Sequence, residues 1–131
     1  MAKVTLRAAT NALERIAPLS NASSWDNVGL LVEPIPEAMA ARILLCIDLT
    51  EAVLDEAIAR KVDLLVAYHP PLFGGVKRLT QSVTLQRSLL RSISHGIAIY
   101  SPHTALDAAA GGVCDWLGDG LGALTASTPL E

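Results

Sequence analysis

The chain has 131 residues, a net charge of −3 and a hydrophobic content of 51%. Its length fits one domain, over residues 1–131, that can bury a core without disulfide bonds. The basic residues are scattered, which gives no support for direct nucleic-acid binding, and no apolar run is long enough to cross a membrane. The N-terminal residues lack the apolar stretch of a secretory signal. We therefore expect a cytoplasmic protein, with the nucleus or the mitochondrion as alternatives.

The mean hydropathy of +0.41 is high for a soluble monomer, although aromatic residues make up only 4% of the chain. Two explanations remain open: a buried partner surface, as in a homo-oligomer or against a further part of the chain, or a tightly packed, alanine-rich domain. Cys46 and Cys114 are the only cysteines and have no CxxC spacing. Cys46 lies in an apolar run, where a reduced and buried thiol is usual.

The first part of the chain predicts a helix, a turn and two strands. Leu6, Ala9, Leu13 and Ile16 recur at helical spacing, and the helix should end before Pro18. Polar residues 21–29 predict a turn. Short apolar runs then predict strands at residues 29–32 and 42–48.

The second part alternates between helices and strands. Thr50 is a candidate N-cap for a helix that follows it, and Gly96 suits the end of a later helix that contains Leu85, Leu89 and Ile93. Strands are expected at residues 63–68 and 97–101, a loop at 69–80, and a further helix from about residue 105; the residues from 118 onward remain unassigned. Strands that alternate with helices predict an α/β fold with parallel strands and right-handed crossovers.

Polar side chains follow three of the predicted strands. Asp48 ends the first, His69 follows the second, and His103 follows the third, with Asp107 four residues later. Because the carboxyl ends of parallel strands share one edge of a sheet, we expect these side chains to lie close together. Imidazole and carboxylate groups are ligands for Zn, Fe, Mn and Ni.

We therefore predict a divalent-metal site formed by His69, His103 and Asp107. A bound ion could lower the pKa of a water molecule to about 7 and supply a nucleophile. No protein general base can be named. The chain has no GxGxxG, P-loop, GxSxG or HExxH motif, so the prediction rests on the convergence of strand ends.

Each candidate ligand also has a structural interpretation. His69 precedes two prolines and could only shape the loop, while His103 could simply end a strand. If Thr104 is an N-cap, Asp107 occupies the third helical position, where acidic residues are common. Asp48 is more often a residue of the turn into a helix than a ligand.

Other polar residues are weaker candidates. His95 lies near a helix C-terminus and is left out of the site. Lys77 and Arg78 follow His69 on the same loop and could meet a phosphate, although solvated loop charges are commoner. The segment Trp25–Asp26–Asn27 favours a structural turn over a catalytic role.

Three separated motifs resemble one known family. They are SSWDNVGLLVEP at residues 23–34, DLLVAYHPPLFGGVKRLT at residues 63–80 and GIAIYSPHTALDAAAGGVCDWL at residues 96–117. Together they are similar to the Nif-three-like family, whose members are also called GTP cyclohydrolase type 2-like proteins. The sequence motifs YHPP and YSPHTALDAA are most similar to those of the eukaryotic branch of that family.

The resemblance implies a three-layer αβα fold with a largely parallel sheet, a dinuclear metal centre and assembly as a homo-oligomer, commonly a hexamer. His103 and Asp107 match the family's HTxxD ligands. Bacterial members have paired histidines where this chain has Tyr68 and His69. Further ligands come from a C-terminal half that these residues do not match, so the chain resembles an N-terminal part of a Nif-three-like protein.

Two functions follow as expectations from the motifs and the resemblance. The first is a metal-dependent hydrolase that acts on a nucleotide or a phosphorylated substrate. The alternative is a non-catalytic regulatory or scaffold protein that binds transcription-related partners, as some members of the family are described. The reduced ligand set beside Tyr68 favours the alternative, and metal content would separate the two.

Overall fold

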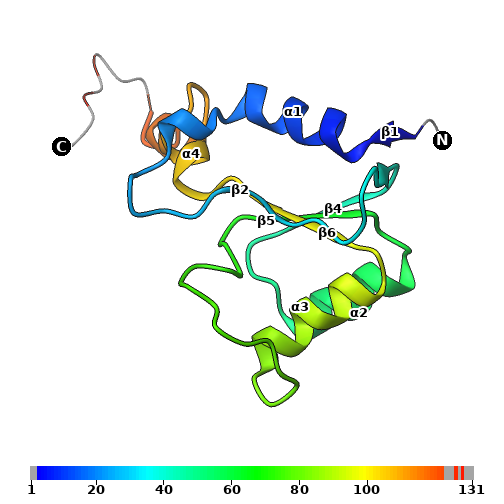
Figure 1. The fold of residues 1–131 in the computed structure, drawn as a ribbon. Coiled ribbons are helices and arrows are strands. Elements are labelled where there is room, and N and C mark those ends of the chain that lie inside the picture. Colours follow the sequence, from blue (N-terminus) through cyan, green and yellow to red (C-terminus); the bar gives the residue numbers. More distant parts are fainter. Residues whose placement is uncertain (1–2, 123–125, 127, 129–131) are drawn as a thin grey trace.

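A four-stranded sheet lies between helices on its two faces (Figure 1). The computed structural model describes residues 3–122, 126 and 128. The strand order is β2-β6-β5-β4, with the bounds β2 Gly29–Val32, β6 Ala98–Ser101, β5 Leu64–Ala67 and β4 Ile43–Cys46. β4, β5 and β6 are parallel, whereas β2 runs antiparallel to β6. The predicted α/β fold with a largely parallel sheet is confirmed.

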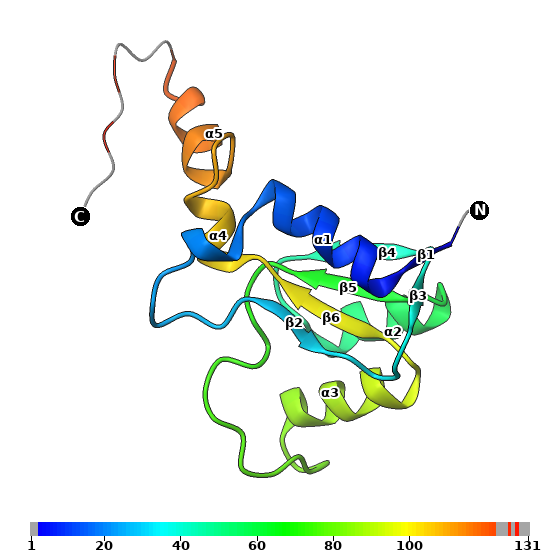
Figure 2. The ribbon, with the colours of Figure 1, turned by 45° about the horizontal axis from the view of Figure 1, so that its top comes forward.

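Each face of the sheet buries its own layer of apolar side chains. Helix α1 (Leu6–Ile16) covers one face, and helices α2 (Glu51–Ala59) and α3 (Thr84–Ser94) cover the other (Figures 1 and 2). Along β5, Leu64 and Val66 pack in the cluster that includes α1, while Leu65 packs in the cluster that includes α2 and α3. This alternation follows from the two-residue period of a strand, and it produces the predicted three layers.

Side-chain caps begin two of the helices. Oγ1 of Thr50 accepts a hydrogen bond from the N–H of Val53 at 3.2 Å, which confirms the predicted start of α2. Thr5 caps α1 in the same way through the N–H of Ala8 at 3.1 Å. At the far end of α3, Gly96 has a φ of +69°, a conformation that glycine adopts without steric cost.

Several short elements were not predicted. Strand β1 (Val4–Thr5) pairs with β3 (Met39–Ala40), and a 3-10 turn, η1, spans Leu19–Asn21. The helix expected from about residue 105 is α4 (His103–Asp107), followed by a separate helix, α5 (Val113–Asp119). Two-residue strands and single turns carry no periodicity, so the sequence could not reveal them. The unassigned residues from 118 onward begin in α5, and most of the remainder lies outside the described residues.

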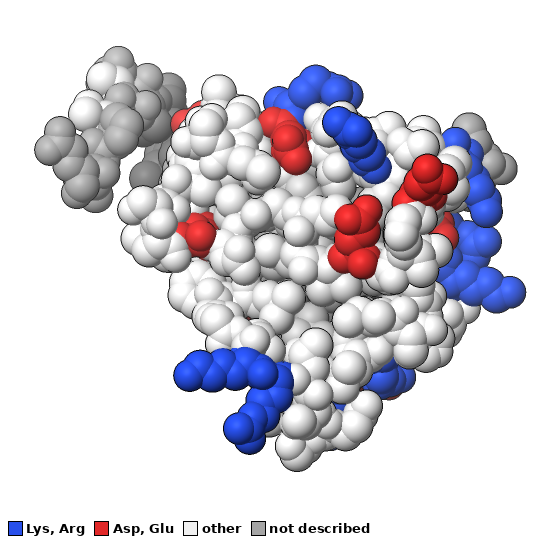
Figure 3. Space-filling model, viewed as in Figure 1, with Lys and Arg blue, Asp and Glu red and all other residues white. Residues whose placement is uncertain are grey.

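The surface combines apolar positions with separated charges. β4 and β2 are the two edge strands of the sheet. Ile43 and Leu45 in β4 are 50% and 74% exposed, and Ile47, just after this strand, is 61% exposed. Figure 3 shows Lys and Arg side chains in separate groups on the face in view, with a broad uncharged area between them. Within the described residues, no helix combines the length and apolarity needed to cross a membrane.

Candidate metal centre

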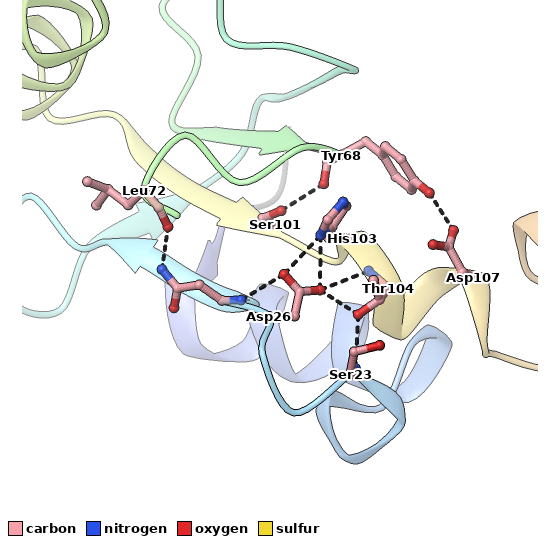
Figure 4. Close-up of polar contacts among 9 residues, drawn as sticks. Ser23, Asp26, Tyr68, Leu72, Ser101, His103, Thr104 and Asp107 are labelled. Atoms are coloured by element: carbon pink, nitrogen blue, oxygen red, sulfur yellow. Dashed lines mark hydrogen bonds and ion pairs between the residues drawn. The ribbon is translucent and has the colours of Figure 1, made fainter. Parts of the chain in front are cut away.

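The predicted site residues lie beyond the carboxyl ends of the parallel strands. Tyr68 and His69 follow β5 directly in the chain. His103 and Asp107 lie on α4, which follows β6, and Figure 4 shows them with Tyr68. The ring centres of His69 and His103 are 5.7 Å apart. The parallel topology thus brings the two histidines together from positions 34 residues apart in the chain.

Asp26 holds His103 from the turn before β2. Its two carboxylate oxygens lie 2.9 and 3.0 Å from Nδ1 of His103 (Figure 4). The side chain of Asp26 is fully buried, whereas that of His103 is 19% exposed. An ionised carboxylate can only accept a hydrogen bond, so Nδ1 of His103 carries a proton, and in the neutral imidazole Nε2 is then left with a lone pair.

Further donors fix the carboxylate of Asp26. The N–H groups of Asn27 and Thr104 donate to it at 2.7 and 3.1 Å, and the hydroxyl of Thr104 also donates to it. Burial raises the pKa of Asp26, but the hydrogen bonds from Thr104, His103 and Asn27 outweigh burial and leave that pKa below its ordinary value. Asp26 therefore stays ionised at neutral pH, as its role toward His103 requires.

The backbone of His103 is itself unusual. Its φ is +30°, a region that residues other than glycine seldom adopt and that typically costs about 1–3 kcal/mol. Such a conformation persists only where surrounding contacts determine it. The buried contacts with Asp26 provide them, and the strained position lies at the candidate site.

A second carboxylate holds the other histidine. Oδ1 of Asp48 lies 2.8 Å from Nδ1 of His69, and the N–H of His69 donates to the carbonyl of Ile47 at 2.9 Å. The side chains of His69 and Asp48 are 49% and 65% exposed, so this contact is weaker than the buried one at His103. Asp48 lies in the turn into α2, and its carboxylate faces His69.

Tyr68 occupies one oxygen of Asp107. Its hydroxyl donates a hydrogen bond to Oδ1 of Asp107 (Figure 4). Burial, followed by this carboxylate, raises the pKa of Tyr68 to about 12, so the hydroxyl keeps its proton and remains a donor at neutral pH. The alternative role of Asp107 at the third position of a helix is wrong, because α4 begins at His103 and Asp107 is its last residue.

Thr104 also differs from its expected role as an N-cap. Its hydroxyl oxygen accepts from the N–H of Ser23 at 3.0 Å, and its hydrogen points to Asp26. Thr104 thereby joins α4 to the turn that carries Asp26. His95 caps the C-terminal end of α3, before β6 begins, and lies at the opposite end of that strand from His103.

The donor set fits part of a metal centre. Two imidazoles that bind one ion through Nε2, at bonds of about 2.0–2.1 Å, have ring centres roughly 5 Å apart, close to the observed separation of His69 and His103. A carboxylate behind a ligating histidine is also the usual arrangement at metal sites. Among the described residues, no three His, Cys, Asp or Glu side chains are gathered in an arrangement that could hold an ion. The fit therefore rests on the two histidines.

Sequence reasoning missed the part that Asp26 plays. The signal available was a carboxylate in a turn between Trp25 and Asn27, which favoured a structural role. Nothing in the spacing of the chain indicates that this turn meets α4, because the contact depends on β2 lying beside β6.

Comparison with known proteins identifies the class. The family described as Duf34/NIF3 (NGG1p interacting factor 3) matches residues 4–131, and the chain belongs to this family. Among its relatives, NIF3-like protein 1 of Homo sapiens is 48% identical over 126 residues, which are 96% of this chain and 33% of the human protein. The NIF3 homolog of Schizosaccharomyces pombe is 55% identical over 102 residues, covering 76% of this chain and 37% of that protein.

Solved structures share the fold. A Bacillus cereus protein related to NIF3 matches with a TM-score of 0.85 and 30% identity over 93% of this chain and 33% of that one. Reduced HcgD from Methanocaldococcus jannaschii matches with a TM-score of 0.83 and 25% identity over 91% and 47% of the two chains. The chain spans about a third of the length of the human and fission-yeast relatives.

Proposed function

We propose that this chain binds a divalent metal ion, such as Zn, Fe, Mn or Ni, through His69 and His103 with Asp107 as a third ligand. We further propose that the metal-loaded protein hydrolyses a nucleotide or another phosphorylated compound. The observation that supports the metal site is the pair of imidazoles 5.7 Å apart, each with Nδ1 beside a carboxylate.

The residues of the chain have separate parts in this proposal. Asp26 and Asp48 keep the proton of each imidazole on Nδ1, so that both Nε2 atoms can donate to an ion. Tyr68 takes up one oxygen of Asp107 and leaves the other for coordination. A divalent ion held there supplies Lewis acidity and makes a nearby water molecule more acidic.

Metal content of the purified and reconstituted protein tests the site. The wild-type chain should hold stoichiometric metal, and His69→Ala, His103→Ala and Asp107→Ala should lose it. His95→Ala is the matched control, because His95 is the one remaining histidine in the sequence and caps α3 away from the site. An absence of stoichiometric metal in wild type after reconstitution, or equal metal in all four variants, would contradict the site.

Hydrolysis requires a second measurement. The metal-loaded protein should release phosphate or a hydrolysed product from at least one member of a set of nucleotides and phosphoesters, and the same histidine variants should abolish this release. If the metal-loaded protein hydrolyses none of them, the hydrolase proposal fails while the metal site can stand.

A non-catalytic binding function is the second candidate. The hydrogen bond from Tyr68 to Asp107 favours it, since the phenol already holds one of the two oxygens of the proposed third ligand. The family description also names an interacting factor. In that case the protein acts as a homo-oligomeric scaffold for transcription-related partners. A chain that binds no metal yet captures such a partner would support this candidate.

A further inference from the structure

Strand β4 leaves one edge of the sheet open. The other edge strand, β2, has an irregular register beside β6, which blunts an edge. β4 instead pairs with β5 in regular register along its whole length, and residues 43–47 contain no glycine, proline or charged residue. The carbonyls of Arg42 and Cys46 accept hydrogen bonds from β5 and from the residue after it. Because the backbone groups of successive strand residues point to opposite sides, those of Ile43 and Leu45 point to the open edge.

The exposed side chains of β4 lie on the face of the sheet that α1 covers elsewhere. Leu44 and Cys46 pack against the cluster beneath α2 and α3. Ile43, Leu45 and Ile47 alternate with them and therefore lie on the opposite face, where each is at least half exposed. The cluster that contains α1 draws its sheet side chains from β5 and β6. An unpaired edge and an exposed apolar row thus coincide on one strand.

The sequence of this strand is complementary to its own reverse. It reads RILLCID from Arg42 to Asp48. When two copies run antiparallel about a two-fold axis at Leu45, this leucine meets its own copy, and Ile43 meets Ile47 of the second copy. The same register sets Arg42 opposite Asp48 at both ends. Apolar side chains then meet apolar ones and opposite charges meet, which are the cross-strand pairs that stabilise a sheet.

Both charged residues have atoms available for this contact. Oδ1 of Asp48 lies 2.8 Å from His69, and that contact does not involve Oδ2. Arg42 donates to the carbonyl of Arg60 at 2.9 Å through Nη1 alone, so its other nitrogens remain. A hollow beside the start of β4 is lined in part by Arg42 and Arg60, although Arg60 also pairs with Glu56 at 3.0 Å. The carboxylate of a second copy would therefore arrive beside two guanidinium groups.

We infer that β4 is the contact between two copies of this chain, which pair antiparallel about Leu45 and join their four-stranded sheets into one. The inference goes beyond the proposed function and beyond the expected homo-oligomer, because neither specifies a surface. A two-fold contact uses the same edge of both copies, so it closes as a dimer. Edge pairing alone forms a small interface, so association depends on concentration, and in dilute solution the single chain with an exposed Leu45 predominates.

Sedimentation equilibrium over a range of protein concentrations tests the pairing. Wild type should pass from monomer to dimer as concentration rises. Leu45→Lys places two ammonium groups side by side at the two-fold axis and should raise the dissociation constant about tenfold or more. Leu117→Lys makes the same change at an exposed leucine on α5 and should dissociate as wild type does. Both leucines are exposed, so both variants should keep the fold, which circular dichroism would check.

A charge exchange tests the ends of the strand. Arg42→Glu sets two carboxylates opposite each other at both ends and should weaken the dimer roughly 2- to 30-fold. Addition of Asp48→Arg restores opposite charges in the reverse order and should recover the dimer. If Arg42 acted only within its own chain, the second substitution would give no recovery.

Cross-linking tests the register. The background is Cys46→Ser with Cys114→Ser, which removes both native thiols. In it, Leu45→Cys should form a disulfide between two chains on mild oxidation with copper phenanthroline, because Cα atoms in a hydrogen-bonded antiparallel pair lie about 5.5 Å apart. Ile43→Cys is the matched control and should not cross-link, since this register separates its two copies by about 14 Å along the strands.

The outcomes decide the inference without reference to the metal site, since no readout depends on bound metal. A wild-type dimer that Leu45→Lys weakens and that Leu45→Cys cross-links supports it. A wild-type chain that is monomeric at every concentration, a dimer that Leu45→Lys leaves unchanged, or equal cross-linking through Leu45→Cys and Ile43→Cys overturns it. A monomer whose β4 edge pairs with an extended segment of another protein would also overturn it.

Discussion

Asp26 places both carboxylate oxygens within 3.0 Å of Nδ1 of His103, although 77 residues separate the two in the chain. The side chain of Asp26 is buried in this contact, and Nε2 on the opposite side of the His103 ring takes no part in it. Asp26 touches no other candidate ligand, so we regard it as a positioning residue that acts through His103.

Asp26→Asn should therefore weaken metal binding without removing a ligand. The amide cannot hold the Nδ1 proton as an ionised carboxylate does, and loss of such a partner typically lowers metal affinity about 10- to 100-fold. Competition with a chelator would measure the affinity, and nitrogen chemical shifts of the His103 ring would report its tautomer. Asp55→Asn, which disturbs only an exposed ion pair with Arg91, is the control. Equal affinity in both variants would refute the positioning role.

Tyr100 should make the protein sensitive to alkaline pH. Burial, and to a lesser degree Glu14, raises the pKa of Tyr100 from 10.0 to about 12. Its folded-state pKa lies above the unfolded value, so the stability it contributes is fully present below about pH 10 and is lost as pH rises toward about 12. Tyr100→Phe should make this alkaline loss shallower, although Tyr68, which has a similar pKa, remains in both proteins.

The same substitution has an expected effect at neutral pH. The hydroxyl of Tyr100 is buried and has no hydrogen-bond partner among the described residues. Removing an unsatisfied hydroxyl should leave the free energy of unfolding unchanged or raise it by about 1–2 kcal/mol. Urea unfolding at neutral pH and near pH 11 checks both expectations. A Phe variant that is less stable at neutral pH would show that the hydroxyl has a stabilising partner.

Burial should decide the cost of truncating leucines in the sheet. Leu65 on β5 is fully buried, so Leu65→Ala should lower the free energy of unfolding by about 2–5 kcal/mol. Leu45 on the edge strand β4 is 74% exposed, and Leu45→Ala should change it by less than about 1 kcal/mol. Chemical denaturation of the two variants provides the comparison, and similar costs would mean that the β4 side chain is covered in solution.

Thr50 should stabilise α2 through its hydroxyl. Thr50→Ala removes the acceptor for the N–H of Val53 and should cost about 0.5–2 kcal/mol of unfolding free energy. Thr50→Ser keeps the acceptor and should restore most of the stability. Thermal unfolding of the two variants measures the difference, and an equally destabilised Ser variant would point to the methyl group of Thr50 instead of the cap.

Local patterns were sufficient to predict most of the fold. The strand at residues 29–32 and the helix that ends before Pro18 agree with β2 and α1, because turn residues and apolar spacing define them. The edge of the sheet at which His69 and His103 meet followed from parallel topology. These features depend on neighbouring residues or on a general rule for strand ends.

Other features of the site could not be read from local patterns. The sequence places Asp26 in a polar turn and gives no sign that the turn packs on α4. The contact of Tyr68 with Asp107 also depends on tertiary structure, since the phenol hydroxyl meets α4 only after β5 and β6 pair. The sequence thus predicts which residues lie at the end of a strand, but it does not predict which side chains from other segments contact them.

The candidate site draws its side chains from segments that begin at the turn around Asp26 and end at Asp107. An unfolded chain cannot hold these groups together, so a ligand that binds them binds the folded form alone. Such a ligand shifts the folding equilibrium by mass action, by about 2.7 kcal/mol at a free concentration one hundred times its Kd. Occupancy and resistance to unfolding are therefore linked in this domain, and its melting temperature should depend on the concentration of whatever binds there.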